Sequence, residues 1–470
     1  MADEQALYQK RIPIFPRSVK GRYRSLKYFI LFVAYAVYFL LPWVPWSRLD
    51  GPSQTVLFDI VERRFYIFNL TVYAQDIFWL AGFLIVAAFL LFFVTGIAGR
   101  VFCGYFCFQT LWTDVYQLIE RLVQGERNAR IKLASSPWTA NKITRMSLTW
   151  LLWLLVAFWT GFSFTLYWGR APQLFIDFFT GHAPFPAYAT TLFLTATTFV
   201  MAGLAREQVC TYMCPYARFQ SAMFDQDTLI VAYDEKRGER GCGRAKPEKG
   251  MLEQQQRIDK DVGDCIDCGY CVQVCPVGID IRNGMQYQCI TCALCVDACN
   301  TIMSSIKYPT GLIRYTSENE LQGKRTNWFK FKNIGYAVAI LVVIGLLSWS
   351  ISHRSLLEMS VHQVRQPLYV MLSDGSIQNR YTIKINNKQP KAVTYRLTVK
   401  DLPDAHWEVR PTENISLGPS ESASFEVRVW LKPGADTEHD KDFEFVLEQE
   451  GTDKPLVSAE VDFYIPHSMR

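Results

Sequence analysis

Five apolar stretches, each long enough to cross a lipid bilayer, place this chain of 470 residues among the integral membrane proteins. A membrane-spanning helix needs about 20 consecutive apolar residues. The mean hydropathy of +0.04 is too polar for a pure membrane bundle, so domains outside the bilayer must accompany the helices. The stretches run approximately over residues 27–45, 78–98, 146–168, 187–205 and 334–352.

The distribution of basic residues predicts the orientation of the helices, because loops rich in Lys and Arg stay on the cytoplasmic side. The N-terminal tail and the connection after the second stretch are basic, whereas residues 169–186 carry the single Lys or Arg residue Arg170. We therefore expect a cytoplasmic N-terminus and a periplasmic C-terminal domain in a bacterial inner membrane. Basic residues in this pattern set the topology of the helices rather than bind nucleic acid, so the expected partner is membrane lipid and not nucleic acid.

Eight of the thirteen cysteines form two runs with one spacing, C-x2-C-x2-C-x3-C. This is the spacing of two-cluster ferredoxins, in which the fourth cysteine of each run ligates the other cluster. We therefore predict one [4Fe–4S] cluster on Cys265, Cys268, Cys271 and Cys299, and a second on Cys289, Cys292, Cys295 and Cys275. Such clusters transfer single electrons.

Zinc binding is the alternative for these eight thiols. A structural zinc site takes four ligands, commonly from shorter cysteine pairs with or without histidine. Two identical runs of four cysteines exceed that need, and no histidine lies near them. The spacing therefore favours clusters over zinc.

Four further cysteines, Cys103, Cys107, Cys210 and Cys214, form two C-x3-C pairs, each after a membrane hairpin that ends near an arginine, Arg100 or Arg206. We interpret the two units as a repeat. The spacing i, i+4 favours a helix that carries both Cys103 and Cys107 with their thiols on one side. Pro215 instead predicts that Cys214 caps a new helix.

These four membrane cysteines are the candidate copper-reduction site, because soft thiolates favour Cu(I). A zinc site or a third cluster would use the same four residues. Small buried apolar residues at helix ends are the non-functional alternative, since unmodified cysteine is commonly buried.

The fold class that follows is a multi-domain membrane protein: a helical transmembrane bundle, an inserted α+β ferredoxin-like module, and a C-terminal all-β immunoglobulin-like sandwich. Alternating residues in about seven short strands predict the sandwich. Residues 234–260, charged and glycine-rich, are interpreted as a linker. The expected segments are a basic tail (1–26), a four-helix core of two hairpins (27–207), a cytoplasmic segment (208–333, module core 260–305), a fifth helix (334–352) and a periplasmic domain (353–470).

The order of these parts resembles the FixG/RdxA/CcoG family, accessory proteins for assembly of cbb3-type cytochrome c oxidase. The segment from Phe58 to Asn69 and on through Gln75-Asp76 is similar to that family's first outer loop. The resemblance implies a cupric reductase that converts Cu(II) to Cu(I) on the cytoplasmic side. Its implied partners are a cytoplasmic electron donor and either a copper exporter or oxidase assembly factors. Phe108 and Asn300 stand where proline is usual after cysteine, and neither departure removes a ligand.

Two rival functions share these motifs. A quinol-dehydrogenase-type subunit resembling NapH would pass electrons to a separate partner, and a non-redox assembly scaffold would use its clusters structurally. The C-terminal sandwich and the order of the whole chain favour the assembly factor. A homo-oligomer is compatible with all three.

Overall fold

The computed structural model describes residues 13–48, 51–73, 76–248, 250–353, 355, 357–389, 392–410, 414–418, 421–432, 441–449 and 452–465. The chain divides into two compact units. The membrane unit comprises Met1–Trp46 and Gln54–Leu347, and the C-terminal unit comprises Ser47–Ser53 and Ser348–Arg470. The four-helix core and the cysteine-rich segment, which we expected as separate segments, therefore pack together in one unit.

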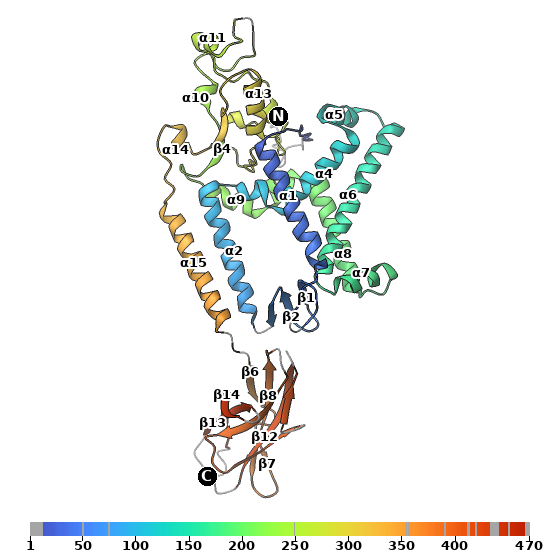
Figure 1. The fold of residues 1–470 in the computed structure, drawn as a ribbon, viewed down its shortest axis with the longest axis vertical. Helices are drawn as coiled ribbons and strands as arrows, with labels where there is room; N and C mark the ends of the chain where they lie inside the picture. The colour runs from blue at the N-terminus through green and yellow to red at the C-terminus, as the bar shows by residue number, and fades with distance from the viewer. Residues whose placement is uncertain are drawn as a thin grey trace, which may run out of the picture. The chain divides into compact units, whose positions relative to one another are not determined.

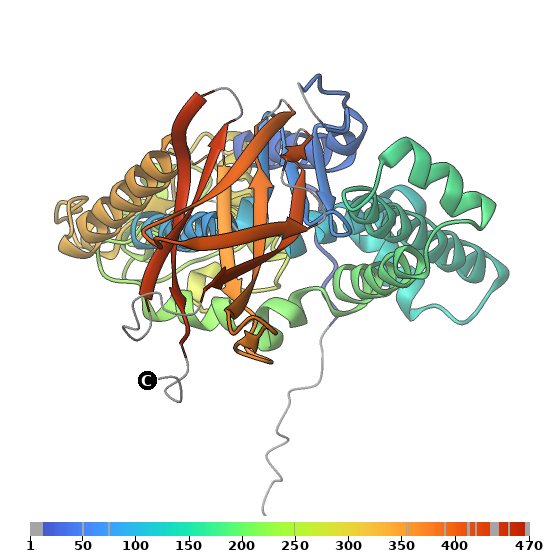
Figure 2. The ribbon, with the colours of Figure 1, turned by 90° about the horizontal axis from the view of Figure 1, so that it is seen from below.

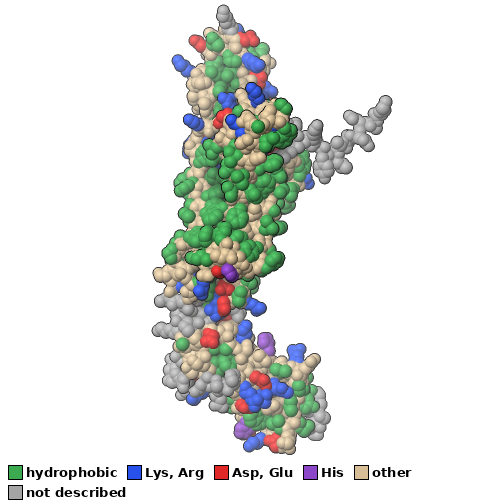
Figure 3. Space-filling model, turned by 90° about the vertical axis from the view of Figure 1, so that its right-hand side faces the viewer, with side chains coloured by type: hydrophobic (Ala, Val, Ile, Leu, Met, Phe, Trp, Pro, Cys, Tyr) green, Lys and Arg blue, Asp and Glu red, His purple; other side chains and the backbone are tan. Residues whose placement is uncertain are grey.

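Five helices among the described residues are long and apolar enough to cross a membrane. They are Arg22–Trp43, Ile77–Ala98, Ala140–Leu166, Phe185–Ala205 and Phe331–Ser352, so the first begins at Arg22 and not near residue 27. In the second and the fifth, 6% of the most apolar window is buried inside the protein. Hydrophobic side chains gather over the helical part of the membrane unit (Figure 3), as expected for a surface that faces lipid.

The helices are joined by short elements at both ends of the bundle (Figure 1). In chain order, the long and short helices that precede the cysteine-rich module are α1 (Arg22–Leu40), η1 (Leu41–Trp43), α2 (Ile77–Ala98), α3 (Val101–Tyr105), α4 (Phe108–Gln124), α5 (Arg127–Ser135), α6 (Ala140–Leu166), α7 (Ala171–Thr180), α8 (Phe185–Thr198), η3 (Phe199–Ala205), η4 (Val209–Met213) and α9 (Pro215–Ala222). A three-stranded antiparallel sheet, β1 (Val56–Asp59), β2 (Arg64–Ile67) and β3 (Leu70–Tyr73), lies between η1 and α2.

The cysteine-rich module includes two paired strands that lie outside the expected module core, residues 260–305. It contains β4 (Ile230–Tyr233), α10 (Glu235–Gly238), α11 (Gln254–Asp259), α12 (Tyr270–Gln273), η5 (Ile281–Asn283), α13 (Leu294–Ser305), β5 (Ile313–Thr316) and α14 (Glu318–Leu321), followed by α15 (Phe331–Ser352). β4 and β5 pair in antiparallel fashion. These strands flank the cysteine-bearing loops and α13 on either side in sequence, so they hold the two ends of the module together.

The interpretation of residues 234–260 as a linker is wrong for the described part of this segment. It contains α10 and α11, and Arg257 is fully buried. Its guanidinium donates hydrogen bonds to the carbonyl oxygens of Gly263 and Cys265 at 2.9 and 3.0 Å. A buried cation that satisfies two carbonyl groups beside a cysteine is part of the module's core.

The basic segment before α1 is bound to this module from residue 17 onward. The backbone N–H of Arg17 donates to the carbonyl oxygen of Gln273 at 2.7 Å. The carboxylate of Asp297, which lies between two cysteines of α13, accepts from the N–H groups of Tyr23 and Arg24 at 3.3 and 2.8 Å. Asp297 thereby caps the first membrane helix, whose N-cap Gly21 has no side chain to do so.

The C-terminal unit is a two-sheet sandwich, as expected from the alternating pattern (Figure 2). One sheet has the order β10-β12-β8-β6, with β7 paired to β8, and the other has the order β11-β9-β13-β14. The strands are β6 (Leu357–Gln363), β7 (Val370–Met371), β8 (Ile377–Asn387), β9 (Val393–Lys400), β10 (Ala405–Arg410), β11 (Asn414–Leu417), β12 (Ser422–Leu431), β13 (Lys441–Gln449) and β14 (Thr452–Phe463). The inward-facing Tyr381, Val427 and Phe445 are fully buried between the sheets.

Candidate iron–sulfur and thiol site

One cavity in the module is lined by the four cysteines predicted for the first cluster. We call them the first set: Cys265, Cys268, Cys271 and Cys299. Cys265 and Cys268 come from the loop that leads into α12, Cys271 lies in α12, and Cys299 comes from α13. Apolar side chains such as Leu312 and Ile313 complete the wall. The run thus folds so that its first three thiols share a cavity with the last thiol of the other run.

A neighbouring cavity is lined by the four cysteines predicted for the second cluster. We call them the second set: Cys275, Cys289, Cys292 and Cys295. Cys271 of the first set also lines this second cavity, so the two cavities adjoin. Each cavity thus groups three cysteines of one run with the fourth cysteine of the other, as the exchange in two-cluster ferredoxins would require.

Burial disfavours the thiolate form of several of these cysteines. It raises the pKa of Cys271 and Cys289 to about 11, and that of Cys275 and Cys299 to about 12. Neighbouring cysteines of the same set raise the pKa further. A thiolate set of this kind needs a bound cation to become stable, so metal loading must release protons.

The spacing of the cysteines fits a cluster better than a single ion. Among the described residues, no three His, Cys, Asp or Glu side chains converge closely enough to hold one metal ion. Tetrahedral zinc needs four donors at about 2.0–2.3 Å from one point. A cubane spreads its four cysteine ligands around a larger body, and each cavity offers four thiols in an apolar wall. The residues present therefore fit a 4Fe–4S centre in each cavity.

The two C-x3-C pairs adopt one local fold. In each, the first cysteine lies in a short helical turn, Cys103 in α3 and Cys210 in η4. The second cysteine is extended and caps the next helix: Cys107 has φ −64° and ψ 128° before α4, and Cys214 has φ −81° and ψ 109° before α9. The prediction for Cys214 is confirmed. The prediction that Cys103 and Cys107 share a helix is wrong, because the chain leaves α3 before Cys107 and restarts at Phe108.

The residue that ends each preceding helix corrects our alignment of the two units. Gly99 after α2 has φ 56° and ψ −125°, and Arg206 after η3 has φ 45° and ψ −113°. Arg206 is therefore the counterpart of Gly99, and not of Arg100. This backbone conformation favours glycine, so Arg206 occupies it at a cost of about 1–3 kcal/mol.

A buried charge network offsets that cost. The guanidinium of Arg206 pairs with Glu120 at 2.5 Å, and Glu120 pairs with Arg130 at 2.8 Å. The side chain of Arg130 is 1% exposed. Arg206 also lies over the ring of Trp153, 5.2 Å from its centroid. These contacts fasten the second repeat to α4 and α5.

The four membrane cysteines are neighbours in space. Burial raises the pKa of Cys103 to about 11 and that of Cys210 to about 12, and in both cases the other cysteines of this group raise it further. The Cys103 thiol donates to the Oε1 of Gln220 at 3.1 Å, which links the first repeat to α9 of the second. The geometry gathers four soft donors without closing them on one ion.

A separate cavity opens on Cys210. Its wall includes Asp114 and Glu207 from the bundle, and Pro276 and Ile290 from the module. Burial alone would raise the pKa of Asp114, but Lys27 at 3.0 Å and Arg24 hold it below its ordinary value. The cavity joins Cys210 to the loops that carry the second set.

Several residues of this site carry no motif that could have identified them. Gln220, Asp114 and Gly104 act through contacts with residues far away along the chain. A buried carboxylate in an amphipathic helix such as α4 is a weak signal by itself, and a glycine between two cysteines is weaker. Their roles follow from the fold.

Comparison with known proteins agrees with this architecture. A family model described as a 4Fe-4S dicluster domain matches residues 205–318, and a model of the IG-like fold at the C-terminal of FixG matches residues 347–466. Protein RdxB of Cereibacter sphaeroides is 44% identical over 405 residues, covering 84% of this chain and 83% of the relative. Nitrogen fixation protein FixG of Rhizobium meliloti is 36% identical over 486 residues, covering 94% and 91%.

The chain belongs to the FixG/RdxA family. Protein RdxA of Cereibacter sphaeroides, 39% identical over 438 residues with 91% of this chain and 90% of the relative covered, is a further member. This FixG/RdxA protein is therefore a membrane iron–sulfur protein of electron transfer, with a 4Fe–4S dicluster domain and a C-terminal immunoglobulin-like domain.

Proposed function

We propose that this FixG/RdxA protein reduces Cu(II) to Cu(I) at the membrane cysteines with electrons from two [4Fe–4S] clusters, one on the first set and one on the second. The observation that carries the proposal is that the three groups of cysteines adjoin one another. The two cysteine-lined cavities share Cys271, and Cys103 packs in one apolar cluster with Cys292 of the second set. The membrane cysteines thus lie at the end of an unbroken series of thiols.

The chemistry divides between cofactor and chain. When bound, the clusters supply single electrons. The chain's own residues hold the substrate ion: four soft thiols favour Cu(I) over Cu(II), which makes reduction more favourable. Burial of Cys103 at 7% exposure restricts water at the reacting end. The cavity beside Cys210 offers a route by which the ion reaches the thiols.

The proposed setting is the cytoplasmic face of a bacterial inner membrane, and the product serves assembly of cbb3-type cytochrome c oxidase. Basic loops support this orientation, since α5 and the start of α6 carry Arg127, Arg130, Lys132, Lys142 and Arg145 on the side of the bundle that bears the module. The C-terminal sandwich would then be periplasmic. A copper exporter or an oxidase assembly factor is the expected recipient of Cu(I).

The test separates the two metal functions by substitution in anaerobically purified protein. We expect about eight irons per chain, four per cubane. Cys210→Ser with Cys214→Ser should abolish copper binding and leave iron near its original level. Cys268→Ser should lower iron and spare copper binding.

Three outcomes would contradict the proposal. Loss of iron in the Cys210/Cys214 variant would mean that these thiols hold a third cluster. Unchanged copper binding in that variant would place the copper site elsewhere. Cluster reduction by a quinol analogue, with no reaction toward Cu(II), would identify the quinol-dehydrogenase-type rival.

A further inference from the structure

The contact between the first C-x3-C turn and the second set is a contact between backbones. A Cβ atom on Gly104 would lie 2.7 Å from the carbonyl oxygen of Ile290 and 3.0 Å from the Cα of Cys292. Both partners are main-chain atoms, which cannot rotate away as a side chain can. Residue 104 must therefore be glycine for α3 to reach the loop that carries Cys292.

Two neighbours of Gly104 hold the same loop. The Tyr105 hydroxyl donates to the carbonyl oxygen of Cys292 at 3.1 Å, and the Arg100 guanidinium donates to the carbonyl oxygen of Tyr287. Tyr105 is 3% exposed and Arg100 is 2% exposed, so water is excluded from the contact. Gly104, Tyr105 and Arg100 thus all contact the short loop that supplies Cys289 and Cys292.

The second repeat is built differently at the corresponding position. Thr211 takes the place of Gly104, and its hydroxyl donates to the carbonyl oxygen of Glu207 within its own turn at 2.9 Å. The next two residues, Tyr212 and Met213, are exposed. Cys210 meets Ile290 across a shared cavity. Close backbone contact with the module is therefore a feature of the first repeat.

Resting on the proposed function, we propose that Gly104, Tyr105 and Arg100 are positioning residues that set the distance between the second set and the membrane cysteines, so that electrons reach Cu(II) from the second set. In this step one electron leaves the reduced 4Fe–4S centre, which is oxidised by one unit, and one Cu(II) becomes Cu(I). No proton or group is transferred. The first set, which meets the second at Cys271, reloads it with an electron from a low-potential one-electron reductant, for which dithionite serves in the assay.

The decisive variant is Gly104→Ala in the full-length protein, with Thr211→Ala as its matched control in the second repeat. Each variant is reduced with dithionite, desalted, and mixed with Cu(II) while the cluster absorbance is followed. Because the rate of electron transfer falls as the distance between donor and acceptor grows, we expect reoxidation in Gly104→Ala to be severalfold slower than in wild type. Thr211→Ala should react at the wild-type rate.

An EPR measurement tests the same assignment without relying on the rate of copper reduction. High-spin Co(II) at the membrane cysteines is paramagnetic and does not accept the electron, so it should shorten the EPR relaxation of the nearer reduced cluster. We expect the affected signal to be the one that Cys289→Ser removes, and the effect to weaken in Gly104→Ala. Equal relaxation of both clusters in wild type, or relaxation confined to the signal that Cys268→Ser removes, would overturn the assignment.

Tyr105→Phe decides the question if Gly104→Ala loses iron. It removes one hydrogen bond to the cluster loop and keeps the ring, so the fold is retained. With full iron content, slower reoxidation supports the positioning role, and a wild-type rate overturns it. A wild-type protein that leaves Cu(II) unreduced would refute the proposed function itself, whereas rapid reduction in both wild type and an iron-replete Gly104→Ala refutes this inference alone.

Discussion

The two C-x3-C repeats share one backbone conformation, but different contacts hold each of them in place. The first repeat is held by backbone contact with the module, through Gly104 and the hydrogen bonds of Tyr105 and Arg100. The second repeat is held by charges, with Arg206 paired to Glu120 and the exit of α9 tied to the fifth helix. The two units thus share a local geometry and have different neighbours. The same cysteine spacing accompanies the same turn, whereas the contacts that support the turn differ between the two units.

The largest effect should come from the charge that supports the second repeat. Glu120→Gln leaves the buried Arg130 and the partly buried Arg206 without their carboxylate partner, and breaking such a network costs about 3–5 kcal/mol of stability. Thermal unfolding of the purified protein in detergent measures the loss. Glu126→Gln is the control, because Glu126 is exposed and its amide replacement can still accept from the Ser18 hydroxyl. Equal stability of the two variants would mean that the network does not hold the repeat.

The backbone of the first repeat should show an intermediate effect. Gly99→Ala places a Cβ 3.0 Å from the carbonyl oxygen of Leu229 at φ +56°, a conformation that costs an L-residue about 1–2 kcal/mol. We expect a lower unfolding temperature with the charge network of the second repeat intact. Gly335→Ala in α15 is the control, since a Cβ there meets nothing within 4 Å. A stable Gly99→Ala protein would break the correspondence between Gly99 and Arg206.

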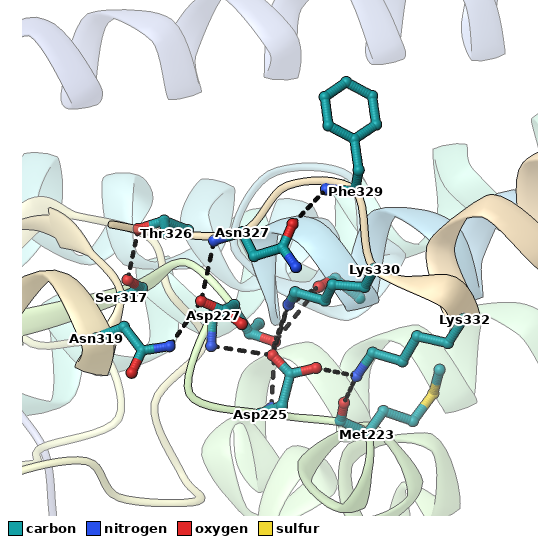
Figure 4. Close-up of polar contacts among 12 residues, drawn as sticks. Met223, Asp225, Asp227, Ser317, Asn319, Thr326, Asn327, Phe329, Lys330 and Lys332 are labelled. Carbon is teal, nitrogen blue, oxygen red and sulfur yellow. Dashed lines mark hydrogen bonds and ion pairs between the residues drawn. The ribbon is translucent and has the colours of Figure 1, made fainter. Parts of the chain in front are cut away.

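The smallest effect should come from the tie between α9 and the fifth helix (Figure 4). Asp225 follows α9 and pairs with Lys330 at 2.5 Å and with Lys332 at the start of α15. Partial burial opposes ionisation of Asp225, but hydrogen bonds from the two lysines lower its pKa to about 2. Its stabilisation is therefore complete above the ordinary pKa of about 4 and is lost as the pH falls through about 2.

Asp225→Asn should consequently destabilise the protein by about 1 kcal/mol at neutral pH, because the Asp225 side chain is 35% exposed and solvent screens its ion pairs. The difference from wild type should shrink as the pH falls below about 4. Unfolding temperatures of both proteins across this range provide the measurement. A difference that is constant with pH would show that the carboxylate charge is not what ties the two elements.

Sequence patterns predicted the features that depend on residues close together along the chain. Apolar runs predicted the five long apolar helices to within about six residues at each end, alternation predicted the sandwich, and the x2-x2-x3 spacing predicted which cysteines share a cavity. Pro215 also correctly marked Cys214 as a helix cap.

Contacts between distant segments were beyond prediction from one sequence. Cys107 was expected on a helix, because nothing after it resembles Pro215, yet the chain leaves α3 there to begin α4. Gly104 is required by Ile290 and Cys292, which lie in another domain of the sequence. The N-terminal residues up to 26 were expected as a tail, yet the Asp297 carboxylate of the module accepts hydrogen bonds from the backbone N–H groups of Tyr23 and Arg24. Each of these depends on how the bundle and the module pack.

Single-turnover copper reduction tests the central claim most directly. Anaerobic protein is reduced, freed of reductant and mixed with Cu(II) in the presence of a Cu(I)-specific chelator. With two clusters that each release one electron, we expect about two Cu(I) per chain for wild type. We expect almost none when Cys103, Cys107, Cys210 and Cys214 are all serine and the iron content is unchanged. Wild-type yields and rates of Cu(I) from that iron-replete variant would contradict the account.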